Sequence, residues 1–130
     1  MDAIQNLEYG EVNIAEDVLA TIAGIAATEV KGVAGMSGGL VGGIAEILGK
    51  KTLSKGVKVV VNEKGVFVDL NLIVDYGTKI PEVAWEIQDK VKKTIQTMAN
   101  LSVVEVNIHI QGVNFPKEEE QTPQQVENTK

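Results

Sequence analysis

The chain contains neither cysteine nor arginine among its 130 residues. The lack of cysteine excludes disulfides, thiolate zinc sites, iron–sulfur clusters and cysteine nucleophiles. All 12 positively charged side chains are lysines, so the chain lacks the rigid guanidinium fork that binds phosphates and guanine bases with two hydrogen bonds. Together with a formal net charge of −6, this composition opposes general nucleic-acid binding, which depends on neutralising phosphates.

Long apolar runs are also missing. The longest, GLVGGIAEIL at 39–48, has ten residues and contains Glu46, whereas a membrane-spanning helix needs about 20 apolar residues. The N-terminal sequence MDAIQNLEYG has neither the basic nor the apolar region of a signal peptide. We therefore expect a cytoplasmic protein.

Five segments with periodic apolar patterns predict one α+β domain. Residues 57–75 alternate on both sides of the turn sequence NEKG and predict a β-hairpin. Residues 15–30 and 78–100 have helical periodicity, whereas residues 11–14 and 102–115 alternate as strands do. With a short helix before the hairpin, the expected order is β-α-(short α)-β-β-α-β. We expect a mainly antiparallel sheet of three to four strands, with two long helices packed on one face.

The same patterns predict which side chains face the core. The first helix is expected to end at Gly32, and its alanines and Gly24 suit close packing on a sheet. The expected inward side chains are Val18, Leu19, Ile22, Ile25, Ala26 and Val30 in the first helix, Ile80, Val83, Ala84, Ile87, Val91, Ile95 and Met98 in the second, and Val104, Val106, Ile108 and Ile110 in the last strand.

Changes in composition predict the limits of the folded region. Residues 1–8 are expected to form an N-terminal tail, and the domain is expected to span residues 9–116. Residues 117–130 are polar and acidic, with one aliphatic side chain, which predicts a disordered C-terminal tail.

A glycine-rich segment at 36–50 invites comparison with a phosphate-binding loop. In such a loop, Gly49 and Lys50 would need a glycine at the position of Ile44, and Lys51 stands where serine or threonine is required. The segment therefore does not match that motif.

An amphipathic helix is the better interpretation of residues 40–48. Its glycines lower its stability, so a helix this short must dock on another surface. That surface is either its own domain or a partner, which includes a second copy of the chain. Its apolar face consists of Leu40, Val41, Ile44, Ile47 and Leu48.

The residues that could carry chemistry are few. His109 is the single histidine and is expected on the polar side of the last strand, where it has no second histidine or cysteine as a metal co-ligand. Asp69 and Asp75 share one side of a predicted strand but are about 20 Å apart along it, too far to act together. We therefore predict no catalytic, cofactor-binding or metal-binding residues.

Trp85 is the most distinctive side chain of the second long helix. At 100° per residue it points away from the apolar stripe of that helix. An outward-facing tryptophan is a frequent centre of protein–protein binding, although it can also lie under the glycine-rich segment or along lysine side chains. We predict that Trp85 contributes to partner binding.

Two long stretches resemble the alkaline-shock-protein family of Gram-positive bacteria, also called the envelope stress response family. They are GEVNIAEDVLATIAGIAATEVKGVAGM at 10–36 and DYGTKIPEVAWEIQDKVKKTIQTMANLSVVEVNIHIQGVNF at 75–115. The resemblance covers roughly residues 9–116. It implies a small cytoplasmic protein without a recognised set of catalytic residues, linked to envelope homeostasis and envelope stress.

The resemblance also implies partners. It predicts self-association and placement near the membrane through a membrane-protein tether. One branch of the family is similar to proteins encoded beside acetyl-CoA carboxylase subunits, which implies those subunits as partners and a role in fatty-acid synthesis. The alternative function is a nucleic-acid-binding module on a related α-β-β-α-β scaffold, which the composition opposes.

Overall fold

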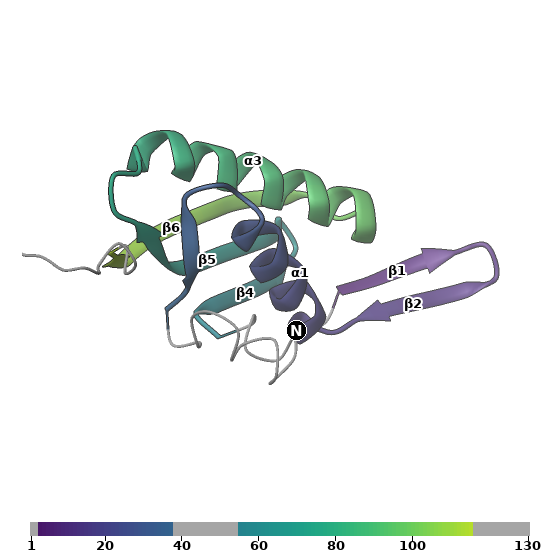
Figure 1. Ribbon diagram of the computed structural model, residues 1–130. Helices are drawn as coiled ribbons and strands as arrows, with labels where there is room; N and C mark the ends of the chain where they lie inside the picture. The colour runs from purple at the N-terminus through teal and green to yellow at the C-terminus, as the bar shows by residue number, and fades with distance from the viewer. Residues whose placement is uncertain (1–2, 38–54, 116–130) are drawn as a thin grey trace, which may run out of the picture.

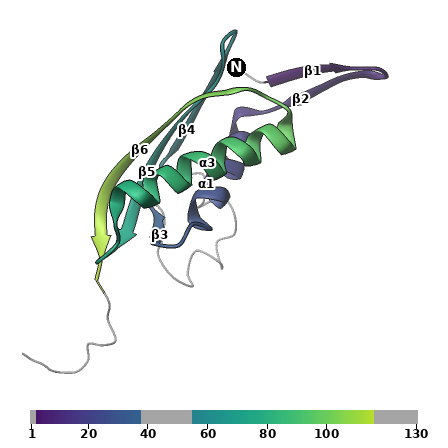
Figure 2. The ribbon, with the colours of Figure 1, turned by 90° about the horizontal axis from the view of Figure 1, so that it is seen from above.

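The computed structural model describes residues 3–37 and 55–115, which form a four-stranded sheet, two helices and a projecting hairpin (Figure 1). Both helices lie against the same face of the sheet (Figure 2), which confirms the predicted α+β architecture. The elements are β1 (Ala3–Leu7), β2 (Gly10–Ile14), α1 (Glu16–Thr28), β3 (Val33–Met36), β4 (Val57–Asn62), β5 (Gly65–Asp75), α3 (Ile80–Ala99) and β6 (Val103–Asn114).

β5 is the central strand. β6 pairs with it in parallel along one edge, from Val66 to Asp75. On its other edge, β4 and β3 pair with it antiparallel in succession. Its side chains alternate between buried and half-buried, as predicted, and the buried ones face the helices. They are Val66, Val68, Leu70, Leu72 and Val74.

β3 ends and β4 begins beside the same residue of β5. The amide of Ser37 donates to the carbonyl of Asn71 at 2.8 Å, and the amide of Asn71 donates to the carbonyl of Gly56, also at 2.8 Å. The glycine-rich connection therefore leaves and rejoins the sheet at one point. The helix predicted at 40–48 and the tail predicted at 117–130 lie outside the described residues.

α1 buries a face of small side chains. Its alanines and Gly24 pack inside, as predicted, with Leu19 as the one large side chain that is fully enclosed. The expected stripe is corrected at Val18, which is 49% exposed, and Ile22 and Ile25 are only half-buried. The buried face of α1 is therefore rotated from the predicted one toward the alanines, whose small side chains let the helix pack closely against the sheet and α3.

α3 buries residues at four-residue intervals. Val83, Ile87, Val91, Ile95 and Ala99 face the core. The predictions for Ile80 and Met98 are corrected, because these side chains are 40% and 66% exposed. A four-residue interval advances 400° around the helix, so the buried line drifts and Ala99 takes the inward position in the last turn.

β6 contains two register shifts. Val66 pairs with Val103, but Phe67 pairs with Glu105, so Val104 is an extra residue in the strand. Such a bulge turns a side chain away from the regular alternation. Val104 is 46% exposed, which corrects its predicted inward position. Beyond the bulge, Val106, Ile108 and Ile110 pack against the core as predicted.

The predicted N-terminal tail is corrected by the β1–β2 hairpin. Residues 3–7 and 10–14 pair from Ala3 with Ile14 to Leu7 with Gly10, and the hairpin projects from the body (Figures 1 and 2). Gln5 fastens it, because its side-chain amide donates to the carbonyls of Ala99 and Asn100 at the end of α3.

Gly56 provides a test of this connectivity. Its φ is +81°, and an added Cβ would lie 2.5 Å from the carbonyl oxygen of Ser37. We expect Gly56→Ala to lower the free energy of unfolding by about 3 kcal/mol, because strain and a backbone clash combine. Urea denaturation measures the loss.

Gly77→Ala is the matched control. Gly77 has a φ of +91° but no atom within 4 Å of an added Cβ, so only the backbone conformation is strained, at about 1–2 kcal/mol. Equal losses for the two variants would contradict the close contact between the ends of β3 and β4.

Candidate functional site

His109 has one acidic neighbour across the sheet. Its Nε2 lies 3.4 Å from Oδ1 of Asp69 on β5, and both side chains are partly exposed. The two residues are 40 positions apart, so sequence spacing could not show this pair. In the described part of the chain, no group of three or more His, Asp or Glu residues could hold a metal ion.

The open face of β5 and β6 carries further polar pairs. The side-chain amide of Gln111 donates to Asn71 at 3.3 Å, and that of Asn114 donates to Asp75 at 3.3 Å. Asp69 and Asp75 therefore have separate partners on β6. This arrangement is that of a solvated sheet face.

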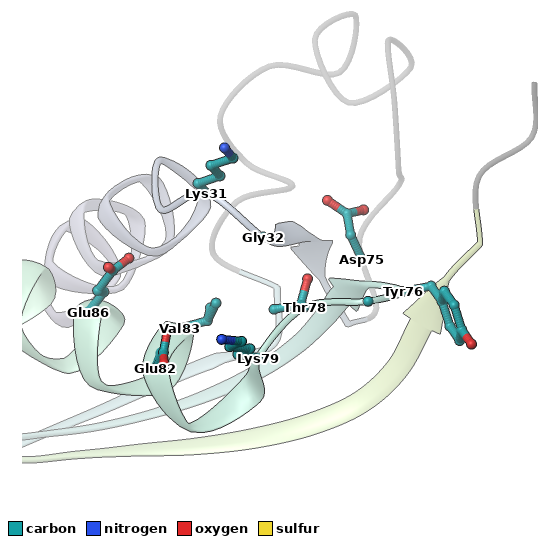
Figure 3. A pocket seen from close by; sticks show the side chains of 10 residues that line it. Lys31, Gly32, Asp75, Tyr76, Thr78, Lys79, Glu82, Val83 and Glu86 are labelled. Atoms are coloured by element: carbon teal, nitrogen blue, oxygen red, sulfur yellow. The ribbon is translucent and has the colours of Figure 1, made fainter.

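A groove lies where α1, β5 and α3 meet (Figure 3). Its volume is about 660 Å³. Lys31 belongs to the turn after α1, whereas Glu82 and Val83 belong to the first turns of α3. Tyr76 is on its border and its ring points away from the groove (Figure 3). The full lining is Lys31, Gly32, Asp75, Tyr76, Gly77, Thr78, Lys79, Glu82, Val83 and Glu86.

Gly32 forms part of this groove and does not cap α1. The helix ends at Thr28 with Glu29 as its cap, which corrects the predicted C-cap. Gly32 has a φ of +102°, and an added Cβ would lie 3.0 Å from a methyl group of Val83. Its carbonyl accepts from the amide of Asp75 at 2.9 Å. Gly32 therefore allows close approach of the chain to α3 and β5.

The groove carries side chains of both charges and includes the first turn of α3. Carboxylates of Asp75, Glu82 and Glu86 share it with two lysines. Pro81 in the first turn has no amide hydrogen, and the amides of Glu82 and Val83 already donate to the carbonyl of Lys79. The helix start is thus poorly equipped for an anion, because few of its amide groups are free.

Trp85 lies on the outer surface of α3, as predicted, and is 63% exposed. One turn later, Gln88 reaches the adjacent edge of β6, where its side-chain amide donates to the carbonyl of Val106 at 3.0 Å. Gln88 and Lys92 also line a groove of about 180 Å³ with residues 103–106. Trp85 therefore stands beside a flank formed jointly by α3 and β6.

A second aromatic feature was not predicted. Tyr76 and Phe115 stack with ring centroids 5.1 Å apart, and both are mostly exposed. They meet because β5 and β6 are parallel and end at the same edge of the sheet. The sequence signal was an aromatic residue directly after each strand, but it is informative only once the strands are known to be parallel.

The remaining predicted binding residues cannot be placed. Leu40, Val41, Ile44, Ile47 and Leu48 belong to residues 38–54, outside the described ranges. Of the predicted partner-binding side chains, Trp85 alone falls within residues 3–37 and 55–115. Within these ranges, no helix has the length and apolar character needed to cross a membrane.

Residues 4–115 match the model of the alkaline shock protein 23 family, which is described as having a cell envelope-related function. The chain is 42% identical over 111 residues to the uncharacterised protein YqhY of Bacillus subtilis, covering 85% of this chain and 82% of that protein. It is also 42% identical over 108 residues to the uncharacterised protein YloU of the same organism, covering 82% of this chain and 90% of YloU.

A more distant relative has a functional name. The stress response regulator gls24 homolog of Streptococcus pyogenes is 28% identical over 102 residues, which cover 78% of this chain and 57% of that protein. No solved structure matches the fold significantly.

The exposure of Trp85 predicts a small role in stability. We expect Trp85→Ala to change the free energy of unfolding by no more than about 0.5 kcal/mol, as is usual for surface side chains. Ile87→Ala, two residues away and fully buried, should cost about 2–5 kcal/mol. Thermal and urea denaturation compare the two, and a large loss for Trp85→Ala would show that this ring packs within its own domain.

Proposed function

Because the chain belongs to the alkaline shock protein 23 family, whose function is related to the cell envelope, we propose that it is a non-enzymatic adaptor in the envelope stress response. In this role it acts by binding other proteins. The gls24 homolog, which is named a stress response regulator, supports the stress context. The proposal includes a role in fatty-acid synthesis. The proposed partners are acetyl-CoA carboxylase subunits or a membrane-protein tether, and we also expect the chain to associate with itself.

Trp85 is the observation that carries the proposal. A tryptophan costs free energy when it stays in water, and buried tryptophans are among the strongest contributors to protein–protein binding. Here it is 63% exposed on α3, one turn before Gln88, whose side chain bonds to β6. A partner that covers this ring gains apolar contact without reorganising α3.

The open sheet face speaks against the nucleic-acid alternative. β5 and β6 contain no lysine, and their carboxylates are Asp69, Asp75 and Glu105. Lys58 of β4 lies opposite Asp69. Related scaffolds that bind nucleic acid need positive charge or exposed stacking rings along the bound strand. The carboxylates here would repel phosphates.

The test is affinity purification from the native cytoplasm, followed by quantitative mass spectrometry. We expect wild type to recover specific proteins, and Trp85→Ala to reduce their recovery about tenfold or more, as for a binding hot spot. Met98→Ala removes another exposed apolar side chain of α3 and is the matched control.

Two outcomes would overturn the proposal. Undiminished recovery by Trp85→Ala would remove Trp85 from the binding surface. Recovery dominated by RNA-processing machinery, with loss of those proteins after nuclease treatment, would support the nucleic-acid alternative instead.

A further inference from the structure

We propose that the outer edge of β6 binds a short extended segment of the partner protein as an additional β-strand, with its apolar residues facing Trp85 and basic residues on the open face. The inference rests on the proposed adaptor function and specifies how the partner is held. β6 pairs with β5 on one side, and no described strand pairs with its other side.

The register identifies which backbone groups of β6 face outward. Val68 pairs with Val106, Leu70 with Ile108 and Leu72 with Ile110. The amide of Val66 donates to the carbonyl of Ser102, whereas Asn71 bonds to Ser37 and Gly56 on the opposite edge of β5. Backbone groups of successive strand residues point to opposite edges, so Val68, Leu70 and Leu72 bond toward β6, to the residues on either side of each β6 partner. Glu105, Asn107 and His109 therefore bond to β5, and the amides and carbonyls of Val106, Ile108 and Ile110 point outward.

The contact of Gln88 agrees with this assignment. Its side chain bonds to the Val106 carbonyl at 3.0 Å, so this carbonyl faces away from β5. The outward groups of Ile108 and Ile110 have no such partner within residues 3–37 and 55–115. A row of free amide and carbonyl groups at a fixed spacing is complementary to another extended backbone.

Helix geometry gives the level of Trp85 along β6. α3 connects the end of β5 to the start of the parallel strand β6 and therefore runs opposite to both. Gln88 marks the level of Val106 on β6. Trp85 precedes Gln88 by three residues, which is a rise of about 4.5 Å along the helix axis. The same distance along a strand corresponds to between one and two residues. Trp85 is thus level with Asn107 and Ile108, where it can cover side chains of an added strand.

The two bulges limit the length of the added strand. β6 is regular from Glu105 to Ile110, between the extra residues Val104 and Gln111. Bulges bend a strand and interrupt pairing at an edge. A regular run of six residues suits a short segment and gives little area for a stable pair of large subunits, which bury about 800 Å² each.

Charge complementarity selects the chemistry of the segment. On the open faces of β5 and β6, Asp69, Asp75 and Glu105 are carboxylates, and neither strand has a lysine. The lysine of this face that is paired with β5 is Lys58 on β4, opposite Asp69 and two strands from the outer edge of β6. On the helix side, the groove is lined by Gln88 and Lys92 of α3 and by the valines of residues 103–106, and the exposed Trp85 lies one turn before Gln88. A strand that alternates basic and apolar residues matches both faces, because successive side chains point to opposite sides.

The test titrates the full chain with the hexapeptide Lys-Val-Lys-Val-Lys-Val, blocked at both ends. Trp85 is the only tryptophan in the chain, so its fluorescence reports coverage of the flank. We expect a blue shift of its emission and slower hydrogen exchange of the Ile108 and Ile110 amides. N-methylation of the peptide backbone should weaken binding about tenfold or more by removing hydrogen bonds, and Glu in place of Lys should abolish it.

Protein variants give an independent comparison. Ile108→Pro removes an outward amide, which an edge strand tolerates because this amide makes no bond to β5, and it should abolish the fluorescence shift. Ile108→Val keeps the amide and should bind as wild type does. Circular dichroism verifies that both variants are folded, and the methylated peptide tests wild type without any substitution.

Three results would overturn strand addition. The first is that the methylated peptide binds as tightly as the unmethylated one. The second is that the peptide slows hydrogen exchange only at amides outside β6. The third is that the hexapeptide does not bind at millimolar concentration. If, in the absence of peptide, hydrogen exchange of the Ile108 and Ile110 amides becomes slower as the protein concentration rises, the edge of β6 binds a second copy of the chain. In affinity purification, partners lost by Trp85→Ala but kept by Ile108→Pro would leave the adaptor function standing and refute this mode. Recovery of no specific partner by wild type would refute the adaptor function itself.

Discussion

The burial of one face of β5 is the constraint on which the rest of the structure depends. Five aliphatic side chains of this strand are buried at alternate positions. Full burial of each is worth about 1.5–3 kcal/mol, so both helices must cover the same side of the sheet. The other face of β5 carries half-buried side chains, among them Asp69, which pairs with His109. The molecule's two faces are different because this one strand alternates so regularly.

Much of the fold could be predicted because its signals are local. Alternation in β5 and four-residue spacing in α3 are properties of continuous segments, and both elements are present as expected. The errors involve tertiary relations. Val104 alternates correctly by sequence, but the bulge against β5 turns it outward. Val18 is apolar and at helical spacing, but α1 turns its small alanine face inward because the neighbouring helix leaves little room.

The candidate site was less predictable for the same reason. Trp85 could be placed outside the core because helical geometry fixes its direction relative to the buried line of α3. The pairs formed by Tyr76 with Phe115 and by His109 with Asp69 could not be predicted, because they depend on the parallel register of β5 and β6. Of the N-terminal hairpin, β2 was predicted from residues 11–14, but β1 was missed because its apolar residues Ala3, Ile4 and Leu7 do not alternate. Its attachment through the side chain of Gln5 to the end of α3 depends on tertiary structure.

The parallel arrangement of β5 and β6 also connects the fold to the binding surface. A parallel connection must cross the sheet, so α3 runs beside β6 with the opposite direction. This brings Gln88 to the Val106 carbonyl and places Trp85 one turn away. An edge strand alone would be a general hazard for aggregation. Here two bulges shorten the accessible run, Gln88 occupies one of its carbonyls, and carboxylates border its open face, so the same features that protect the edge also restrict which segment can pair with it.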